Sequence, residues 1–576
     1  MSRLTRCAAA VFHLGLRQAG RHLIHRATSH TRRFRRYASR PGGGLEFAGR
    51  AAAPFLVHAA GAALRDGSFT ALNRTRPVGD PPRWDTEGPL AWLFNLHYFS
   101  YLDALPQDRQ LRLVLDWIHC YPPSRRRPGW MPYPLSLRLR NWAKLLYLAP
   151  DWPAPDRAAV LASMEAQANC LADNLEFHLR GNHLLESGLT LKLLAAGFRG
   201  RATGRWSRLA DAVLRGELDE QFLADGGHVE RSPMYHALLN RGLLDLVNVL
   251  PERDPMRERI LGRLPSILGF LAAVRHPDGD IALLNDGALG IAPQPEALLE
   301  YAAGLGLRAP DTAIAAFPQT GYYVWRRGGE ALLVDAGPIG PDYLPGHGHG
   351  DIFSFEMSLG GKRVVIDGGT STYEAGAERD WARSTRAHNT VELAGADQCE
   401  FFGAFRVGRR GRPREVTAHV SEEGLRVHGW HDGYRRLPGR PLHHRELAFR
   451  PPGILLVWDT VKSRVDHPAV SRIRFPPGAV LHTSGPREAL VDLGGQELVV
   501  RAFGGEVTEE NGQYAPRFGE RLPCPVIALR KGREPEFGYA IAPRHVATAI
   551  DAAGALLGGH RWERKARQGD RGVAEA

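Results

Sequence analysis

Hydrophobic and polar positions divide the chain into two stretches with different periodicities. Between about residues 88 and 310, apolar residues recur at every third or fourth position, which predicts helices over 156–175, 183–198, 206–224, 232–250 and 255–274. Ser232-Pro233 and Asp254-Pro255 each place a capping residue before a proline suited to the first helical position. Helices of similar length joined by short loops indicate stacked antiparallel pairs, which form either an open solenoid or a closed toroid.

From about residue 318 the pattern changes to short β-rich runs separated by turn residues. The runs are GYYVWRR, EALLVDAG, IFSFEMSLGG, KRVVIDGG, GILLVWDTV, ELVVRAF and FGYAIAP. Gly360-Gly361 between two alternating runs predicts a hairpin turn and antiparallel pairing. We therefore expect an α+β multidomain chain, with a helical domain followed by a large antiparallel β-sandwich. The boundary is predicted within 306–320, with a cleft where the domains meet.

Composition and charge narrow the choice of partner. No apolar run approaches the ~20 residues that cross a bilayer, so we expect no transmembrane segment. The 74 Lys and Arg against 62 Asp and Glu give a net charge of +12, which favours an acidic partner such as nucleic acid, anionic lipid or acidic polysaccharide. Much of this charge lies in residues 1–40, which indicates either a basic lead-in or a membrane-surface or targeting segment. The five cysteines are scattered and form no CxxC pair, so we expect mostly buried thiols.

The sharpest motif is GHGHGD at 346–351, directly before a predicted strand. In an extended backbone alternate residues share a face, so His347, His349 and Asp351 are expected to point toward one site. The glycines would let a ligand approach the main chain closely. The motif therefore indicates a binding or catalytic site, although a chain with 24 histidines also brings some together by chance.

A candidate metal site combines this motif with two residues at later strand ends. Asp367 ends the run RVVID, and His388 opens the run HNTVEL. Two imidazoles and one carboxylate suit zinc or a similar divalent ion, so His349, Asp367 and His388 form the expected ligand set. Asp351 is a competing ligand or a turn-forming residue.

Two clusters in the helical half place polar groups at predicted helix starts. Asn182 and His183 either hold a substrate carboxylate at a helix N-terminus, or Asn182 is the capping residue of that helix, with Glu186 favourable to the helix dipole. Tyr235 lies in the first turn of the helix over 232–250, where its phenol either projects into a cleft or packs in the core. Aromatic and basic residues within 84–142 form either a sugar-binding groove or helix core.

Several motifs together resemble the heparinase II/III family of polysaccharide lyases, which includes related alginate lyases. They are NHLLESG at 182–188, SPMY at 232–235, GHGHGD at 346–351, VVIDGGTSTY at 364–373 and RAHNTV at 386–391. They occur in order within roughly residues 85–400. WMPYPLSLRLRNW at 130–142 is also similar to the N-terminal domain of exopolysaccharide-cluster members of this family.

The resemblance implies an α/α toroid followed by an antiparallel β-sandwich. We divide the chain into a basic lead-in (1–45), the toroid (46–315), the sandwich (316–560) and a tail (561–576). The implied catalytic residues are Asn182, His183, Tyr235 and His347, with Glu186 and Tyr373 as lesser candidates, and the implied metal ligands are His349, Asp367 and His388. The metal, zinc or another divalent ion, is expected to have a structural role.

The implied reaction is β-elimination on an acidic, uronate-containing polysaccharide. Asn182 and His183 would bind the uronate carboxylate, either Tyr235 or His347 would take the C5 proton, and a positioned acid would protonate the departing O4 oxygen. The alternatives are a non-catalytic or remodelling exopolysaccharide-binding protein and a metal-dependent glycan hydrolase. No nucleic-acid module is recognisable. The family implies a periplasmic location, and the lack of a clear signal peptide leaves a cytoplasmic one open.

Overall fold

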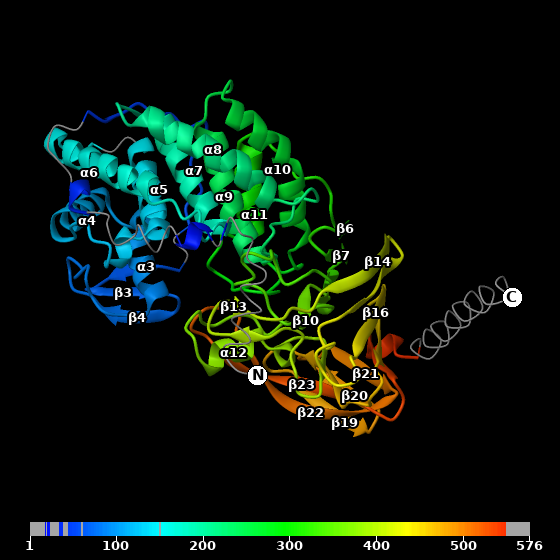
Figure 1. The fold of residues 1–576 in the computed structure, drawn as a ribbon. Coiled ribbons are helices and arrows are strands. Elements are labelled where there is room, and N and C mark those ends of the chain that lie inside the picture. The colour runs from blue at the N-terminus through cyan, green and yellow to red at the C-terminus, as the bar shows by residue number, and fades with distance from the viewer. Residues whose placement is uncertain are drawn as a thin grey trace.

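The structure, a computed structural model, describes residues 18, 20–23, 34–38, 44–58, 61–148 and 151–548. The expected tail and most of the expected basic lead-in lie outside these residues. Figure 1 shows most of the helices in one half of the molecule and most of the strands in the other. The change from helix to strand falls between Gly304, the last residue of helix α11, and Ile314, the first of strand β6.

The helical half contains the five helices that the periodicity predicts. Its longer helices are α3 (Leu90–Tyr98), α4 (Gln107–Cys120), α5 (Pro132–Tyr147), α6 (Ala154–Asp173), α7 (Gly181–Gly197), α8 (Thr203–Gln221), α9 (Pro233–Val249), α10 (Pro255–Ala273) and α11 (Pro295–Gly304). The predicted caps are formed, because Ser232 accepts a hydrogen bond from the backbone N–H of Tyr235, and Asp254 accepts one from Met256. Within the described residues, no helix combines the length and apolar character needed to cross a bilayer.

Small sheets that the pattern did not predict complete the helical half. Strand β1 (Glu46–Phe47) pairs with β5 (Phe198–Arg199), and β2 (Ala63–Arg65), β3 (Ser68–Ala71) and β4 (Arg74–Pro77) form a three-stranded sheet. These strands are two to four residues long, too short for an alternation of polar and apolar positions to stand out.

The β half is built from antiparallel sheets. The five-stranded sheet has the order β10-β9-β8-β7-β6, the eight-stranded sheet β14-β15-β16-β17-β24-β21-β20-β19, and the four-stranded sheet β11-β18-β23-β22. Their bounds are β6 (Ile314–Phe317), β7 (Tyr322–Arg327), β8 (Glu330–Asp335), β9 (Ser354–Leu359), β10 (Lys362–Val365), β11 (Val391–Leu393), β14 (Pro413–Ser421), β15 (Gly424–His431), β16 (Leu442–Arg450), β17 (Ile454–Lys462), β18 (Ala469–Arg474), β19 (Val480–Gly485), β20 (Glu488–Asp492), β21 (Glu497–Phe503), β22 (Gly505–Tyr514), β23 (Leu522–Lys531) and β24 (Glu536–Pro543). The predicted Gly360-Gly361 turn joins β9 to β10, with both glycines at positive φ.

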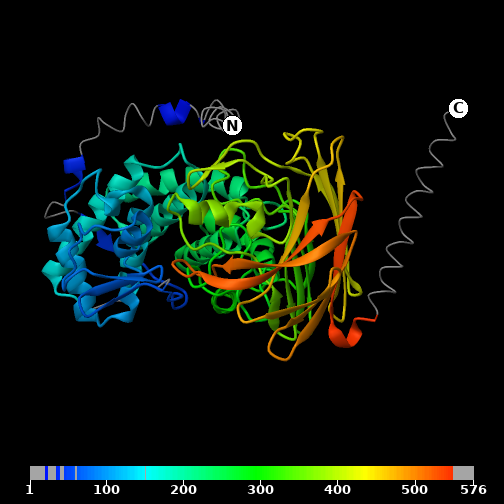
Figure 2. The same ribbon diagram turned by 90° about the horizontal axis from the view of Figure 1, so that it is seen from below.

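One hydrophobic core joins the faces of these sheets. It includes Trp325 and Phe355 from the five-stranded sheet, Leu447 and Tyr539 from the eight-stranded sheet, and Ile473 from the four-stranded sheet. Apolar residues from the inner faces thus pack together, as in a β-sandwich. The expected fold class, a helical N-terminal region followed by an antiparallel β domain, is confirmed. Figure 2 shows the two halves side by side from below.

Candidate active site

A pocket of about 550 Å³ is lined by residues from both halves of the molecule. Four helices contribute residues spaced three or four apart, so one face of each helix follows the pocket wall. These residues are Phe94, Asn95 and Tyr98 on α3, Tyr133, Leu137 and Arg140 on α5, Asn182, His183 and Glu186 on α7, and Met234, Tyr235, Leu238 and Arg241 on α9. Loops of the β half add Gly346, His347, Tyr373, Phe405 and Phe518.

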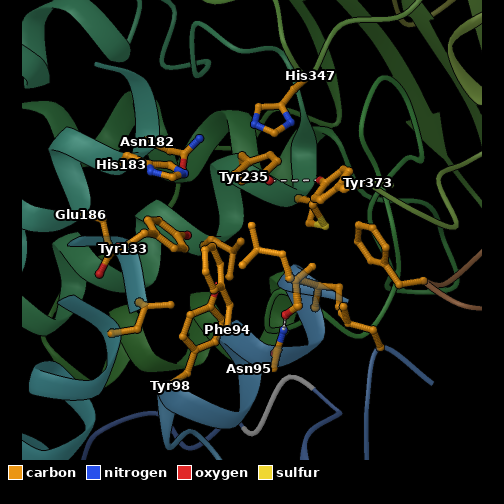
Figure 3. Close-up of a pocket in the computed structure, with 18 of the residues that line it drawn as sticks. Phe94, Asn95, Tyr98, Tyr133, Asn182, His183, Glu186, Tyr235, His347 and Tyr373 are labelled. Carbon is orange, nitrogen blue, oxygen red and sulfur yellow. Dashed lines mark hydrogen bonds between the residues drawn. The ribbon is translucent and has the colours of Figure 1, made fainter. Parts of the chain in front are cut away.

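The predicted catalytic residues meet at one end of this pocket (Figure 3). The ring centroids of Tyr235 and His347 are 4.2 Å apart. The hydroxyl of Tyr235 is hydrogen-bonded to that of Tyr373 at 3.0 Å. Asn182 and His183 line the same end from α7. Residues from distant parts of the sequence therefore come together at one end of the same pocket.

His347 is oriented by Asp286, a residue that sequence reasoning missed. Its Nδ1 lies 2.7 Å from Oδ2 of Asp286, and its side chain is 12% exposed. Nδ1 lies closer to a carboxylate than Nε2 does, since Nε2 is 3.5 Å from Glu230, which favours the tautomer with the proton on Nδ1 and Nε2 as the proton acceptor. Burial would raise the pKa of Asp286, but Arg379 and the hydrogen bonds from His347 and His349 hold it well below its usual value.

Asp286 contacts every other member of a buried polar cluster between the two halves. Its other oxygen lies 2.9 Å from Nε2 of His349, and Arg379 of helix α12 (Ala377–Arg383) pairs with both oxygens. The Thr370 hydroxyl also donates to it, at 3.2 Å. No motif or periodicity marks Asp286, because it lies in a loop after α10 and its partners follow 61 to 93 residues later.

The GHGHGD motif precedes a strand, as predicted, but its side chains do not share one face as expected for an extended backbone. Residues 346–351 form a loop, and Gly348 packs against Ile339 so closely that a Cβ atom would not fit. The loop directs His347 into the pocket and buries His349 and Asp351 away from it. The three side chains therefore serve two neighbouring sites rather than one.

Asn182 does not cap α7. The helix begins at Gly181 after Arg180, and Asn182 donates from its backbone N–H and its side-chain amide to the buried carboxylate of Glu230, at 2.9 to 3.2 Å. Glu230 also lies 3.5 Å from Nε2 of His347 and has no role in the sequence-based prediction. The side-chain nitrogen of Asn182 thus contacts both carboxylate oxygens of Glu230, which holds the amide at the pocket wall.

His183 and Tyr235 have pKa values shifted in ways that fit different roles. Burial lowers the pKa of His183, but Glu176, 2.9 Å from Nδ1, more than offsets this and raises it above its usual value. A cationic imidazole suits a substrate carboxylate. Burial, followed by Tyr373, raises the pKa of Tyr235 well above its usual value. The phenol therefore stays protonated and suits the role of acid rather than base.

Glu186 and the aromatic stretch have mainly structural contacts. Glu186 pairs with Arg140 at 2.6 Å, and burial raises its pKa. Of the aromatic and basic residues within 84–142, Phe94, Tyr98, Tyr133 and Arg140 line the pocket. The tryptophans there are buried, and Arg138 lies over the ring of Trp117 at 4.0 Å. Most of this stretch is helix core.

His349, Asp351 and His388 fit a metal site behind the pocket. Each is buried and offers one ligand atom, and these atoms lie within 4.8 Å of one another. Three polar atoms of this group have no hydrogen-bond partner, namely His349 Nδ1, Asp351 Oδ2 and His388 Nε2. Unpartnered buried polar atoms are costly, and imidazole and carboxylate are good zinc ligands. The bound metal itself stays a prediction.

Asp367, the carboxylate expected in this site, lies against His388. Its oxygens are 2.8 and 3.1 Å from Nδ1 of His388, and it also accepts a hydrogen bond from the backbone N–H of Gly369. A carboxylate placed in this way either binds a metal beside the imidazole or orients the imidazole that does. The structure therefore adds Asp351 to the expected set and places Asp367 next to it.

Comparison with known proteins gives matches along most of the chain. A family model described as heparinase II/III N-terminus matches residues 109–288, and one described as heparinase II/III-like, C-terminal, matches residues 309–541. FtsZ-localized protein C of Caulobacter vibrioides is 30% identical over 392 residues, which cover 62% of this chain and 63% of that protein. A heparin-sulfate lyase of Pedobacter heparinus is 24% identical over 321 residues, or 48% of each chain. The matched stretches thus span between about half and two thirds of these relatives.

Solved structures share the fold at low sequence identity. A crystal structure of heparinase III has a TM-score of 0.67 at 16% identity and covers 81% of this chain and 80% of its own. Heparan sulfate lyase HepC from Pedobacter heparinus has a TM-score of 0.55 at 17% identity, and the match covers 82% of this chain and 79% of HepC. The two-domain architecture is therefore shared with these structures.

Proposed function

The chain belongs to the heparinase II/III-like family, and from this premise we propose that it is a polysaccharide lyase that cleaves an acidic, uronate-containing glycan by β-elimination. One observation carries the proposal: the Tyr235 phenol and the His347 imidazole come from different domains and lie 4.2 Å apart, ring to ring, in one pocket. Asn182 and His183, which suit the substrate carboxylate, line the same pocket.

The proposed reaction begins with the uronate carboxylate. The C5 proton next to it is weakly acidic, because its removal adds negative charge beside a carboxylate. The ring of His183, whose raised pKa favours its cationic form, and the amide of Asn182 would stabilise this charge as it develops. Nε2 of His347 would take the C5 proton, since Asp286 holds the ring proton on Nδ1.

Tyr235 would complete the elimination. As the C4–O4 bond breaks and the C4–C5 double bond forms, the phenol would give its proton to the departing O4 oxygen, and no water is consumed. The Tyr373 hydroxyl, 3.0 Å away, would hold the phenol in place. A divalent ion bound by His349, His388 and a neighbouring carboxylate would supply positive charge that fixes the GHGHGD loop beside the pocket.

The direct test is a panel of acidic polysaccharides and oligosaccharides. Unsaturated uronide ends absorb near the ultraviolet edge, so release of this absorbance measures β-elimination. We expect at least one uronate-containing glycan to give unsaturated products that contain no oxygen from labelled water. Products that carry that oxygen and have no double bond would show hydrolysis and contradict the proposal.

Two alternatives make different predictions. A metal-dependent hydrolase would need a metal at the sugar, yet His349, Asp351 and His388 are buried behind His347, away from the pocket lining. A glycan-binding protein without turnover is favoured by one observation, because the relative with 30% identity is named for localization with FtsZ rather than for a lyase activity. Binding of an acidic glycan without unsaturated products would support this second function.

A further inference from the structure

Helix α9 carries a cation further along the pocket wall. Met234, Tyr235, Leu238 and Arg241 line the pocket from one face of the helix. Arg241 is six positions after Tyr235, so the two residues lie about 9 Å apart along the helix axis at 1.5 Å per residue. This separation exceeds one pyranose ring. Arg241 is therefore placed to contact the sugar residue next to the one that reacts.

Two acidic neighbours of Arg241 are already paired with other cations, and a third, Asp103, acts on Arg241 through its charge without a close ion pair. Arg140 pairs with Glu186 at 2.6 Å, and Lys144 pairs with Asp245 at 2.7 Å. Among the residues that the structure describes, no carboxylate oxygen lies within 4.0 Å of the Arg241 guanidinium, whose hydrogen bond runs from Nη1 to the backbone oxygen of His58 at 3.5 Å. Arg241 therefore lacks an ion-pair partner of its own in that part of the chain.

Burial removes water from the Arg241 guanidinium, so its charge costs free energy where the described part of the chain supplies no ion-pair partner. Arg241 is 8% exposed, and its Nε has no hydrogen-bond partner. Burial and the nearby Arg140 lower the pKa of Arg241, and the carboxylates of Asp245, Glu186 and Asp103 offset this only in part. A bound anion would supply the missing partner, and the planar guanidinium matches a carboxylate or a sulfate with two parallel hydrogen bonds.

We propose that Arg241 forms a second anion subsite in the pocket, which takes a carboxylate or sulfate ester on the sugar residue next to the reacting uronate. The inference rests on the proposed lyase function and specifies its substrate as a glycan that is acidic on adjacent residues. Phe94 and Tyr98 line the same pocket from α3 and offer aromatic faces to the sugar.

The test compares matched oligosaccharides that each present a reacting uronate. In the first the neighbouring sugar is neutral, in the second it carries a carboxylate, and in the third it carries a sulfate ester. Arg241→Gln is expected to lower kcat/KM about ten- to hundred-fold for whichever charged substrate the subsite takes, as expected for a lost charge-assisted contact, and to lower it much less for the neutral substrate. Arg241→Lys, which keeps the charge, should recover part of the loss.

The control is Arg112→Gln on α4, because that side chain is 73% exposed and pairs with Asp108 on the helix surface. It should act as the wild type does on all three substrates. Melting temperature and circular dichroism would confirm that each variant is folded. If Arg241→Gln does not fold, the test compares kcat/KM of Arg241→Lys and of the wild type for the charged and neutral substrates.

Binding measured by titration calorimetry separates this inference from the proposed activity. In one outcome the wild type forms no unsaturated product but binds the oligosaccharides with a charged neighbour more tightly than the neutral one, and Arg241→Gln removes that preference. This outcome would support the subsite and contradict the lyase function. If the wild type cleaves all three substrates and Arg241→Gln slows them equally, the subsite is overturned and the lyase function stands. Equal binding and no cleavage would overturn both.

Discussion

The Nδ1 atom of His347 lies 2.7 Å from Oδ2 of Asp286, so a loop of the helical half fixes the orientation of an imidazole from the β half. The pair joins the two domains at the pocket. Any relative movement of the domains would disturb it, and the geometry of the proposed base therefore depends on how the domains pack.

Replacement of Asp286 tests this relationship. Asp286→Asn keeps the shape but removes the charge that holds the proton on Nδ1 of His347, so we expect kcat to fall about 100-fold or more, with a smaller change in KM. Because Arg379 then loses its buried partner, the free energy of unfolding should fall by about 3–5 kcal/mol. Steady-state kinetics and denaturant unfolding measure the two effects.

A matched control exists in the β-sandwich. Asp459 is equally buried, pairs with Arg445 through both oxygens, and lies 2.7 Å from Nε2 of His443. Asp459→Asn should destabilise the fold to a similar degree and leave the activity of the folded fraction unchanged. If both variants lose activity only in proportion to unfolding, Asp286 has no positioning role.

The two proposed proton-transfer groups give a second prediction. Tyr235→Phe removes the phenolic proton, and His347→Ala removes the base, so each should lower the rate of elimination at least ~100-fold. Tyr373→Phe should have a smaller effect, because it only removes the hydrogen bond that holds the Tyr235 hydroxyl. Retained formation of unsaturated product by Tyr235→Phe would assign the acid to another group.

The raised pKa of His183 predicts a dependence of substrate binding on pH. The imidazole is charged below its pKa, so KM for a uronate substrate should stay low in that range and rise as pH increases through the pKa. Glu176→Gln removes the carboxylate that raises this pKa, and the increase in KM should then begin at lower pH. The control is Glu258→Gln, at an exposed position on α10. Identical profiles for Glu176→Gln and the wild type would remove the charged role of His183.

The metal site predicts loss of bound metal on substitution. His349→Ala and His388→Ala should abolish stoichiometric zinc and lower the melting temperature, because binding energy contributes to folding. Asp351→Asn and Asp367→Asn should each weaken binding, since one carboxylate binds the metal and the other orients His388. Elemental analysis of the purified variants measures this, with His482→Ala at an exposed position as control. If all four variants kept the zinc content of the wild type, the proposed metal site would be contradicted.

The sequence alone determined the elements that local pattern controls. The helices over α6 to α10 and the strands of the β half follow from apolar spacing, and the Ser232 and Asp254 caps and the Gly360-Gly361 turn follow from the conformations these residues favour. Each of these signals lies within a few residues of the structure it predicts. The ordered motifs also located Tyr235 and His347.

Only the tertiary structure decided which side chains meet. Asn182 is hydrogen-bonded to Glu230, 48 residues away in the sequence, and Tyr235 is hydrogen-bonded to Tyr373, 138 residues away. A single aspartate or glutamate in a loop has no periodicity, so Asp286 could not be distinguished from any exposed acid before the two domains brought it against His347. Contacts between distant polar residues depend on how whole domains pack, and that packing leaves no local mark in the sequence.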